Sequence, residues 1–281
     1  MEIKKYLINS SVEWTSRDYA LFFGLIPLAL ILFFVLPADL QNQIILKPLE
    51  PTLLSAFFSN YLHTNLEHLV GNLFSYLTVM LLLFNLETDK KRFYFTALVM
   101  LTILPPISST FIILVLSRII STSVGFSAIV AGLLGYMVYA LYAYVKRNYY
   151  SQLTYNFLWL LLMLNVFVWS ISWLNYDFLL ISSIMIIWLF YMNRQAIKET
   201  LLKIRPKIRK PLKKLLPQVG FILLTVALAV LGLQTLLTRD FASQGHLMIN
   251  IPAHYVGYLC GLIFPLIYDN FVRSKNDNKG T

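Results

Sequence analysis

The sequence has few charged residues and a single cysteine. Only 13% of its 281 residues are charged and 58% are apolar, whereas a soluble domain carries about a quarter charged residues. The single cysteine, Cys260, lies within an apolar run, so this chain alone offers neither a disulfide framework nor a cysteine-based metal cage. No internal repeat, low-complexity tract or soluble domain is evident. The composition therefore excludes a soluble enzyme or scaffold and indicates a protein whose solvent is lipid.

Long apolar stretches fill most of the chain. The first follows about twenty mixed residues and precedes many others, so we expect a retained helix and no cleaved signal peptide. The predicted fold class is an all-α polytopic membrane protein, with a transmembrane domain over 19–272 between short tails at 1–18 and 273–281. Eight stretches approach the roughly twenty residues that cross a bilayer, at about 20–36, 61–84, 93–116, 125–145, 155–174, 178–193, 218–237 and 252–269.

The basic residues predict the orientation of these spans. If the N-terminus is cytoplasmic, eight crossings leave only Lys47, Arg118 and Arg239 outside, of 23 Lys and Arg in total. So one-sided a distribution follows the positive-inside rule. The net charge of +10 therefore reports topology and not a nucleic-acid partner. We expect a multi-pass protein of the cell membrane with both termini in the cytoplasm.

One segment, 194–214, concentrates nine Lys or Arg with Leu and Ile between them. It is expected to lie against the inner leaflet of the membrane. Two interpretations stay open, a contact with anionic lipid and a plain orientation signal. The second is favoured, because orientation alone requires such runs.

Polar residues also lie inside three of the spans, where lipid makes them costly and where they point to a functional site. The second span contains His63, His68 and Asn72. At about 100° per residue His68 and Asn72 lie one turn apart on the same face, where two side-chain donors can point at one place. The fourth span begins with Gly125 and has Ser127 at its outer end.

The last span brings a further histidine to the same depth. His254 lies near the start of this span. In the predicted topology the last span, like the second and fourth, runs from outside to inside, so His254 lies in the outer part of the membrane. Small residues that share a face let two membrane helices approach backbone to backbone. Such residues are Ala253, Gly257 and Gly261 on the last span, and Ala128, Ala131, Gly132 and Gly135 on the fourth.

This arrangement predicts a serine nucleophile with a histidine base. Close contact of the two spans would bring Ser127 within hydrogen-bond reach of His254, and a neutral serine needs such a base to act as a nucleophile. The oxyanion formed on attack needs donors in a poorly hydrated site, which His68, Asn72 and the Ser127 backbone N–H can supply. Asp269 lies about 22 Å along the helix from His254. The prediction is therefore a Ser–His dyad without an acidic third member.

In these residues the sequence resembles the rhomboid family of intramembrane serine proteases. The resemblance covers about 50–145 and 250–270, and its motifs occur in the family's order with consistent orientation. The motifs are His63-x4-His68-x3-Asn72 on the second span, Gly125-Phe126-Ser127-Ala128 at the serine, and Ala253-His254-x2-Gly257-x3-Gly261 on the last span.

The resemblance implies a rhomboid-like helical bundle that cleaves transmembrane protein substrates near the membrane surface without metal, nucleotide or other cofactor. The implied roles are nucleophile for Ser127, general base for His254, oxyanion donors for His68 and Asn72, and supporting residues of the cavity for His63, Gly125, Gly257 and Gly261.

The sequence departs from the family pattern in four respects. The loop at about 37–60 is short and lacks the family's frequent Trp-Arg pair. Ala128 follows the serine where glycine is usual, and Ala131 stands where many members have a tyrosine packed beneath the histidine. Two extra spans separate Ser127 from His254. A helix pair inserted within 150–237 accounts for them, because a pair leaves His254 on the same side of the membrane.

Three other functions are less consistent with the sequence. A catalytically inactive relative that binds membrane clients is disfavoured by the intact Ser127 and His254. A transporter would be expected to show inverted repeats or helices interrupted at mid-membrane, whereas the polar groups here gather near one face. A metal site formed by the four histidines, among them His246, is disfavoured because no His-Glu-x-x-His run is present. The oligomeric state is left open.

Overall fold

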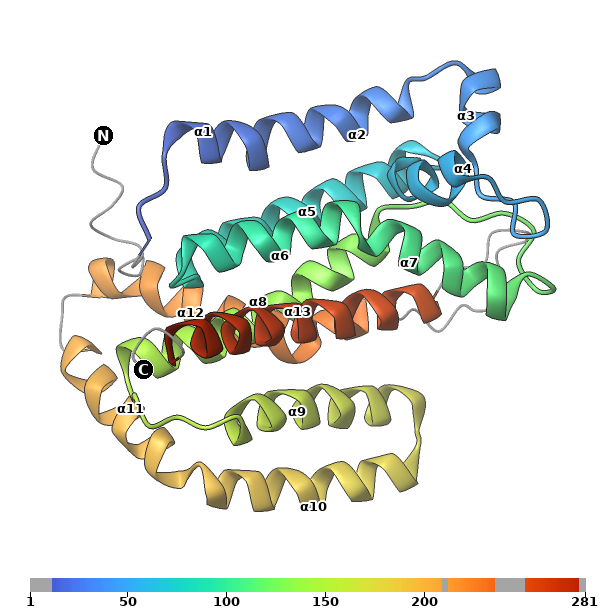
Figure 1. Cartoon of the computed structure of the whole chain (residues 1–281). Coiled ribbons are helices and arrows are strands. Elements are labelled where there is room, and N and C mark those ends of the chain that lie inside the picture. The colour runs from blue at the N-terminus through green and yellow to red at the C-terminus, as the bar shows by residue number, and fades with distance from the viewer. Residues whose placement is uncertain (1–11, 209–211, 236–250, 278–281) are drawn as a thin grey trace. The chain divides into compact units, whose positions relative to one another are not determined.

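The computed structural model describes residues 12–208, 212–235 and 251–277, which form helices joined by short loops (Figure 1). The helices are α1 (Ser16–Tyr19), the π-helical η2 (Ala20–Leu25), α2 (Ile26–Phe34), α3 (Ala38–Ile44), α4 (Leu53–Phe58), the 3-10 helix η3 (Ser59–Tyr61), α5 (Leu66–Leu86), α6 (Lys90–Thr102), α7 (Leu104–Phe111), the π-helical η4 (Ile112–Leu116), α8 (Ser127–Asn148), α9 (Asn156–Trp173), α10 (Tyr176–Met192), α11 (Arg194–Ile208), α12 (Leu212–Thr235) and α13 (Ile251–Asp277).

The expected all-α membrane fold is confirmed, with a different number of spans. Among the described residues five helical segments are long and apolar enough to cross a membrane, or up to seven if each of two bent helix pairs is one span. The expected span at 218–237 falls on α12, where the apolar stretch Leu223–Gly232 is shorter than a span. The five segments are Ser16–Phe34, Leu66–Leu86, Ser127–Asn148, Asn156–Trp173 and Pro252–Val272.

The bend between α6 and α7 divides what the sequence predicts as one span at 93–116. The two helices meet at an angle of 40°, just before Pro105 and Pro106. Proline lacks the N–H that would bond the carbonyl four residues earlier, so Pro105 deprives the Leu101 carbonyl of its helical partner. The hydroxyl of Tyr61 donates to that carbonyl instead. A side chain from a distant loop thus stabilises the bend.

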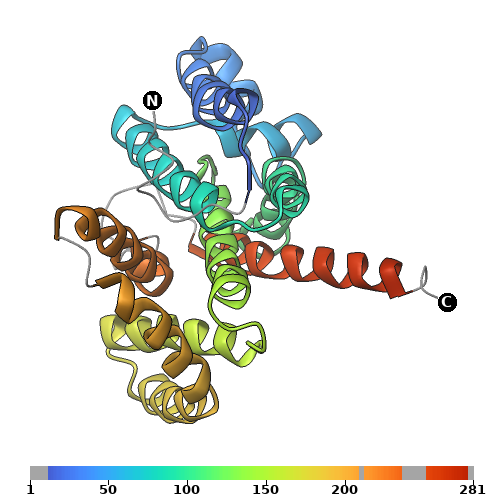
Figure 2. The same ribbon diagram turned by 90° about the vertical axis from the view of Figure 1, so that its left-hand side faces the viewer.

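The described chain separates into two compact units. Of the described residues, the core unit comprises 13–81, 90–136 and 251–277, and the hairpin unit comprises 12, 82–89, 137–208 and 212–235. In the core unit α13 packs along α6 and α7, and α4 packs on α7. Figure 2 shows α13 crossing the first turns of α8.

The hairpin unit is built on α9 and α10, which run side by side in opposite directions (Figure 1). Leu174 ends α9 in the left-handed conformation, with φ 53°, and the Asn175 side chain caps α10 by accepting from the Phe178 N–H. Helix α12 packs on α9, where the Asn165 amide donates to the Ala229 carbonyl. Polar groups in this unit therefore serve helix ends and helix contacts.

Candidate active site

The loop before α8 is fixed by an aromatic anchor and by backbone hydrogen bonds. Phe126 is fully buried, and its ring centroid lies 5.7 Å from those of Tyr61 and Tyr76. The Gly125 N–H donates to the Ser59 carbonyl at 3.1 Å, and φ of +134° at Gly125 is a conformation that favours glycine. These contacts hold the chain immediately before Ser127, the first residue of α8.

Close packing of α8 on α13 determines where the last histidine lies. A Cβ added at Gly257 would overlap the carbonyl of Ala128, and one added at Gly261 would overlap the carbonyl of Gly132. Gly135 meets the Tyr258 carbonyl in the same way. The two backbones are therefore in direct contact, as small-residue stripes allow in membrane helices.

This contact brings the predicted serine and histidine together. Ser127 Oγ lies 2.7 Å from His254 Nε2, a usual distance for a hydrogen bond with a hydroxyl. His254 is only 3% exposed, so the pair is poorly hydrated. Both residues belong to the core unit, although they are 127 positions apart in the chain.

His68 lies on the other side of the Gly125 loop. A Cβ built on Gly125 would stand 3.1 Å from His68 Nε2 and 3.7 Å from Ser127 Oγ, so both atoms border the same small space. Asn65 accepts from the His68 N–H at 2.8 Å and caps the start of α5. The Thr64 hydroxyl lies 3.5 Å from His68 Nδ1. Nε2, the other ring nitrogen of His68, is the one that borders this space.

Asn72 lies one turn further along α5 and is only 6% exposed. Its Nδ2 is buried and has no hydrogen-bond partner among the described residues. Nearly all buried polar groups in proteins are paired, so an unpaired donor needs an explanation. A donor without a partner is available to a group that arrives with a substrate.

His63 lies before the start of α5 and packs edge to face on His68, with ring centroids 5.1 Å apart. It is 3% exposed. The two rings are therefore in direct contact, and His63 packs against the His68 ring.

A small polar cavity of about 20 Å³ borders Ser127. A volume of this size holds about one water molecule. Ser108 contributes a buried hydroxyl that has no partner among the described residues, so the cavity offers a water molecule at least one free polar group. Its polar lining consists of Ser59, Asn60, Ser108, Ser109, Ser123 and Ser127.

Several neighbouring residues have roles that sequence patterns do not reveal. Asp269 pairs with Arg92 on α6 at 3.1 Å, so it serves the C-terminal part of α13 and not the histidine. The Tyr258 hydroxyl is buried without a partner in the described part of the chain. Ala131, fully buried on α8, offers no hydroxyl either. Among the described residues no three His, Cys, Asp or Glu side chains are grouped to hold a metal ion.

Comparison with known protein families identifies the family of this chain. The Rhomboid domain matches residues 50–188. The chain belongs to the rhomboid family. The matched region includes His68, Asn72 and Ser127, whereas His254 lies beyond it, on α13. Comparisons with curated proteins and with solved structures found no match.

Rhomboid proteins are typically intramembrane serine proteases. Membership of this family and the apolar helices make the chain a multi-pass membrane protein. The hydrogen-bonded Ser127 and His254 are the residues whose chemistry such an activity would use.

Proposed function

We propose that this protein is an intramembrane serine endopeptidase that cleaves transmembrane protein substrates with a Ser127–His254 dyad. The observation that carries the proposal is the distance of 2.7 Å between Ser127 Oγ and His254 Nε2. Family membership supports the reaction class, and the unpaired Asn72 amide supports the second requirement of acyl transfer, a preformed donor for the oxyanion.

The first half of the reaction forms an acyl-enzyme. Ser127 Oγ attacks the carbonyl carbon of the scissile peptide bond while its proton passes to His254 Nε2. The carbonyl oxygen becomes an oxyanion, which accepts from Asn72 Nδ2 and from His68 Nε2–H. His254 then gives the proton to the leaving amine nitrogen as the C–N bond breaks.

The second half releases the acyl group. A water molecule attacks the ester carbon and loses a proton to His254 Nε2, and that proton returns to Ser127 Oγ as the ester bond breaks. The cavity of about 20 Å³ beside Ser127 has room for this water. Hydrolysis in a buried site thus has a source of water that does not require the helices to separate.

The proposed substrates are transmembrane helices of other proteins. Every backbone amide of a membrane helix is already hydrogen-bonded within the helix, so the segment must unwind locally before its carbonyl can reach Ser127. With both termini of this protein in the cytoplasm, as the basic residues predict, cleavage takes place near the outer surface of the membrane.

The proposal is tested with purified protein in liposomes and a model substrate that has one transmembrane helix. The wild type is expected to cleave it, and Ser127→Ala and His254→Ala are each expected to abolish cleavage. Ser183→Ala is the matched control, because its hydroxyl bonds the Leu179 carbonyl of its own helix in the hairpin unit. Activity that survives Ser127→Ala would mean a different nucleophile. A folded but inactive wild type, across several substrates, would favour the client-binding alternative.

A further inference from the structure

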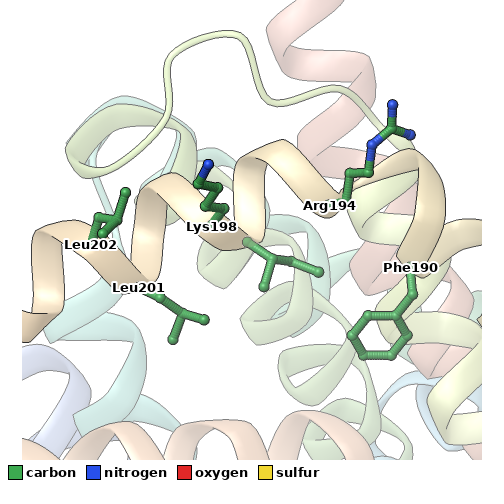
Figure 3. Close-up of a pocket in the computed structure, with 6 residues that line it drawn as sticks. Phe190, Arg194, Lys198, Leu201 and Leu202 are labelled. Atoms are coloured by element: carbon green, nitrogen blue, oxygen red, sulfur yellow. The ribbon is translucent and has the colours of Figure 1, made fainter.

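The break between α10 and α11 carries a pocket unrelated to the serine site. Helix α10 and the first part of α11 meet at an angle of 61°, and a pocket of about 480 Å³ lies at the bend (Figure 3). Pockets for small ligands have volumes of this order. The lining consists of Phe190, Arg194, Ile197, Lys198, Leu201 and Leu202.

The lining combines an apolar wall with two cations. In Figure 3 Arg194 and Lys198 extend from the same side of α11, with Leu201 and Phe190 on the other side. The two basic residues are four positions apart and so share a helix face. No carboxylate is among the described residues that line the pocket. The chemistry fits a ligand with an anionic group and a long apolar part.

Arg194 is held in position while it keeps hydrogen-bond donors for a ligand. Its guanidinium lies 4.1 Å from the ring centroid of Tyr191, and its Nη1 donates to the Tyr191 carbonyl at 3.2 Å. A guanidinium has five N–H donors and binds phosphate with two at once. The stacked arginine is therefore already oriented for an anion.

The position of the pocket along the chain corresponds to a membrane surface. Helix α10 is an apolar helix whose last turns expose Trp188 and Tyr191 at 51% and 61%, and aromatic residues of this kind gather at the bilayer interface. The basic segment follows immediately. In the predicted topology this interface is the cytoplasmic one, where anionic lipids concentrate.

We propose that this pocket binds one anionic phospholipid, with the phosphate at Arg194 and Lys198 and an acyl chain against Phe190, Leu201 and Leu202. Charge complementarity and the apolar wall together select this ligand. A zwitterionic lipid has the chain but lacks the net negative charge, and a free anion has the charge but lacks the chain. The hairpin unit would thereby bind anionic phospholipids in preference to zwitterionic ones.

The first test compares two lipids with identical acyl chains. Purified protein is incubated with dioleoyl phosphatidylglycerol or dioleoyl phosphatidylcholine, and retained lipid is counted by native mass spectrometry. We expect the wild type to retain one phosphatidylglycerol about tenfold more tightly than phosphatidylcholine. The double variant Arg194→Gln/Lys198→Gln is expected to lose that preference. Both residues are exposed, so folding should persist.

A matched control removes the same charges elsewhere. Lys47→Gln/Arg118→Gln also replaces one lysine and one arginine at exposed positions, in the predicted outer loops, and is expected to keep the preference. Equal retention of the two lipids by the wild type would overturn the proposal, because the pocket would then show no preference for an anionic lipid. Equal loss in both double variants would also overturn it, because general charge attraction would then account for binding.

A second variant tests the apolar part of the pocket without changing its two cations. Leu201→Trp keeps both cations and fills part of the space, at a position that is 61% exposed and so tolerant of size. If the acyl chain lies in the pocket, this variant loses the phosphatidylglycerol preference as the double variant does. Retention of phosphatidylglycerol that is unchanged by Leu201→Trp would contradict the proposed position of the acyl chain.

Discussion

The contact between α8 and α13 differs in kind from the contact between α9 and α10. The first is made backbone to backbone through glycines, whereas the second is made by side chains such as Trp169 and Phe178, whose ring centroids lie 5.8 Å apart. In the hairpin, serines such as Ser170 and Ser182 bond carbonyls of their own helices. The backbones of α8 and α13 thus lie close together where a hydroxyl must reach an imidazole. In the α9–α10 hairpin the helices are held by side-chain packing, and their serines bond within their own helices.

The largest effect is expected from widening the first contact. Gly261→Leu forces side-chain atoms into the Gly132 carbonyl and separates Ser127 from His254, so we expect cleavage to fall by at least about a hundredfold, since displacements near 1 Å cost this much. Cleavage rates in liposomes measure the effect. Gly71→Ala is the control, because nothing lies within 4 Å of its added Cβ. Near-normal cleavage by Gly261→Leu would disprove the direct backbone contact.

Asn72 of the core unit and Asn165 of the hairpin unit are both buried, but their amides differ in hydrogen bonding. Asn72 Nδ2 has no partner among the described residues, so Asn72→Ala should leave stability nearly unchanged while the rate falls by about 10²–10³-fold, as for other oxyanion donors. The measurements are kcat and the unfolding midpoint on the same preparation. A variant that loses stability and keeps its rate would assign Asn72 to packing alone.

Breaking the ion pair of Arg92 and Asp269 tests what holds the C-terminal part of α13. The Arg92 side chain is only 6% exposed, and removing one partner of a buried pair leaves an uncompensated charge. We expect Arg92→Leu to lower the free energy of unfolding by about 2–3 kcal/mol, measured by denaturant titration in detergent. Arg92→Leu/Asp269→Leu should recover part of the loss. An unchanged midpoint in the single variant would show that the pair contributes nothing.

The smallest effect is expected in the hairpin unit. The Asn165 amide donates to the Leu161 carbonyl at 2.9 Å and to the Ala229 carbonyl of α12. Hydrogen bonds between membrane helices contribute about 1 kcal/mol, so Asn165→Ala should lower stability by that amount and leave the rate per folded molecule unchanged. This is the reverse of the pattern predicted for Asn72→Ala. A rate that fell with Asn165→Ala would link the hairpin unit to catalysis.

Local spacing was enough to predict the parts of the site that lie on helices. The glycine and alanine stripes predicted that α8 and α13 would touch, and the structure brings Ser127 to His254 by that contact. The interval of four residues also predicted that His68 and Asn72 would share a face of α5. These features follow from helix periodicity and the small size of the residues, both of which are visible in one sequence.

Features that depend on distant loops could not be predicted in this way. The anchoring of Phe126 by Tyr61, the bond from Gly125 to Ser59 and the Arg92–Asp269 pair join segments that no local pattern connects. The bend before Pro105 was also missed, because apolar composition alone made 93–116 one span. A proline pair within an apolar stretch was the signal that could have revealed it.

The central claim, that His254 activates Ser127 as a nucleophile, is tested most directly by covalent labelling. A fluorophosphonate probe is attacked at phosphorus by an activated serine oxygen with loss of fluoride, and peptide mass spectrometry identifies the modified residue. We expect a single adduct on Ser127 in the wild type and none in His254→Ala. Labelling of another serine, or labelling of Ser127 undiminished by His254→Ala, would contradict it.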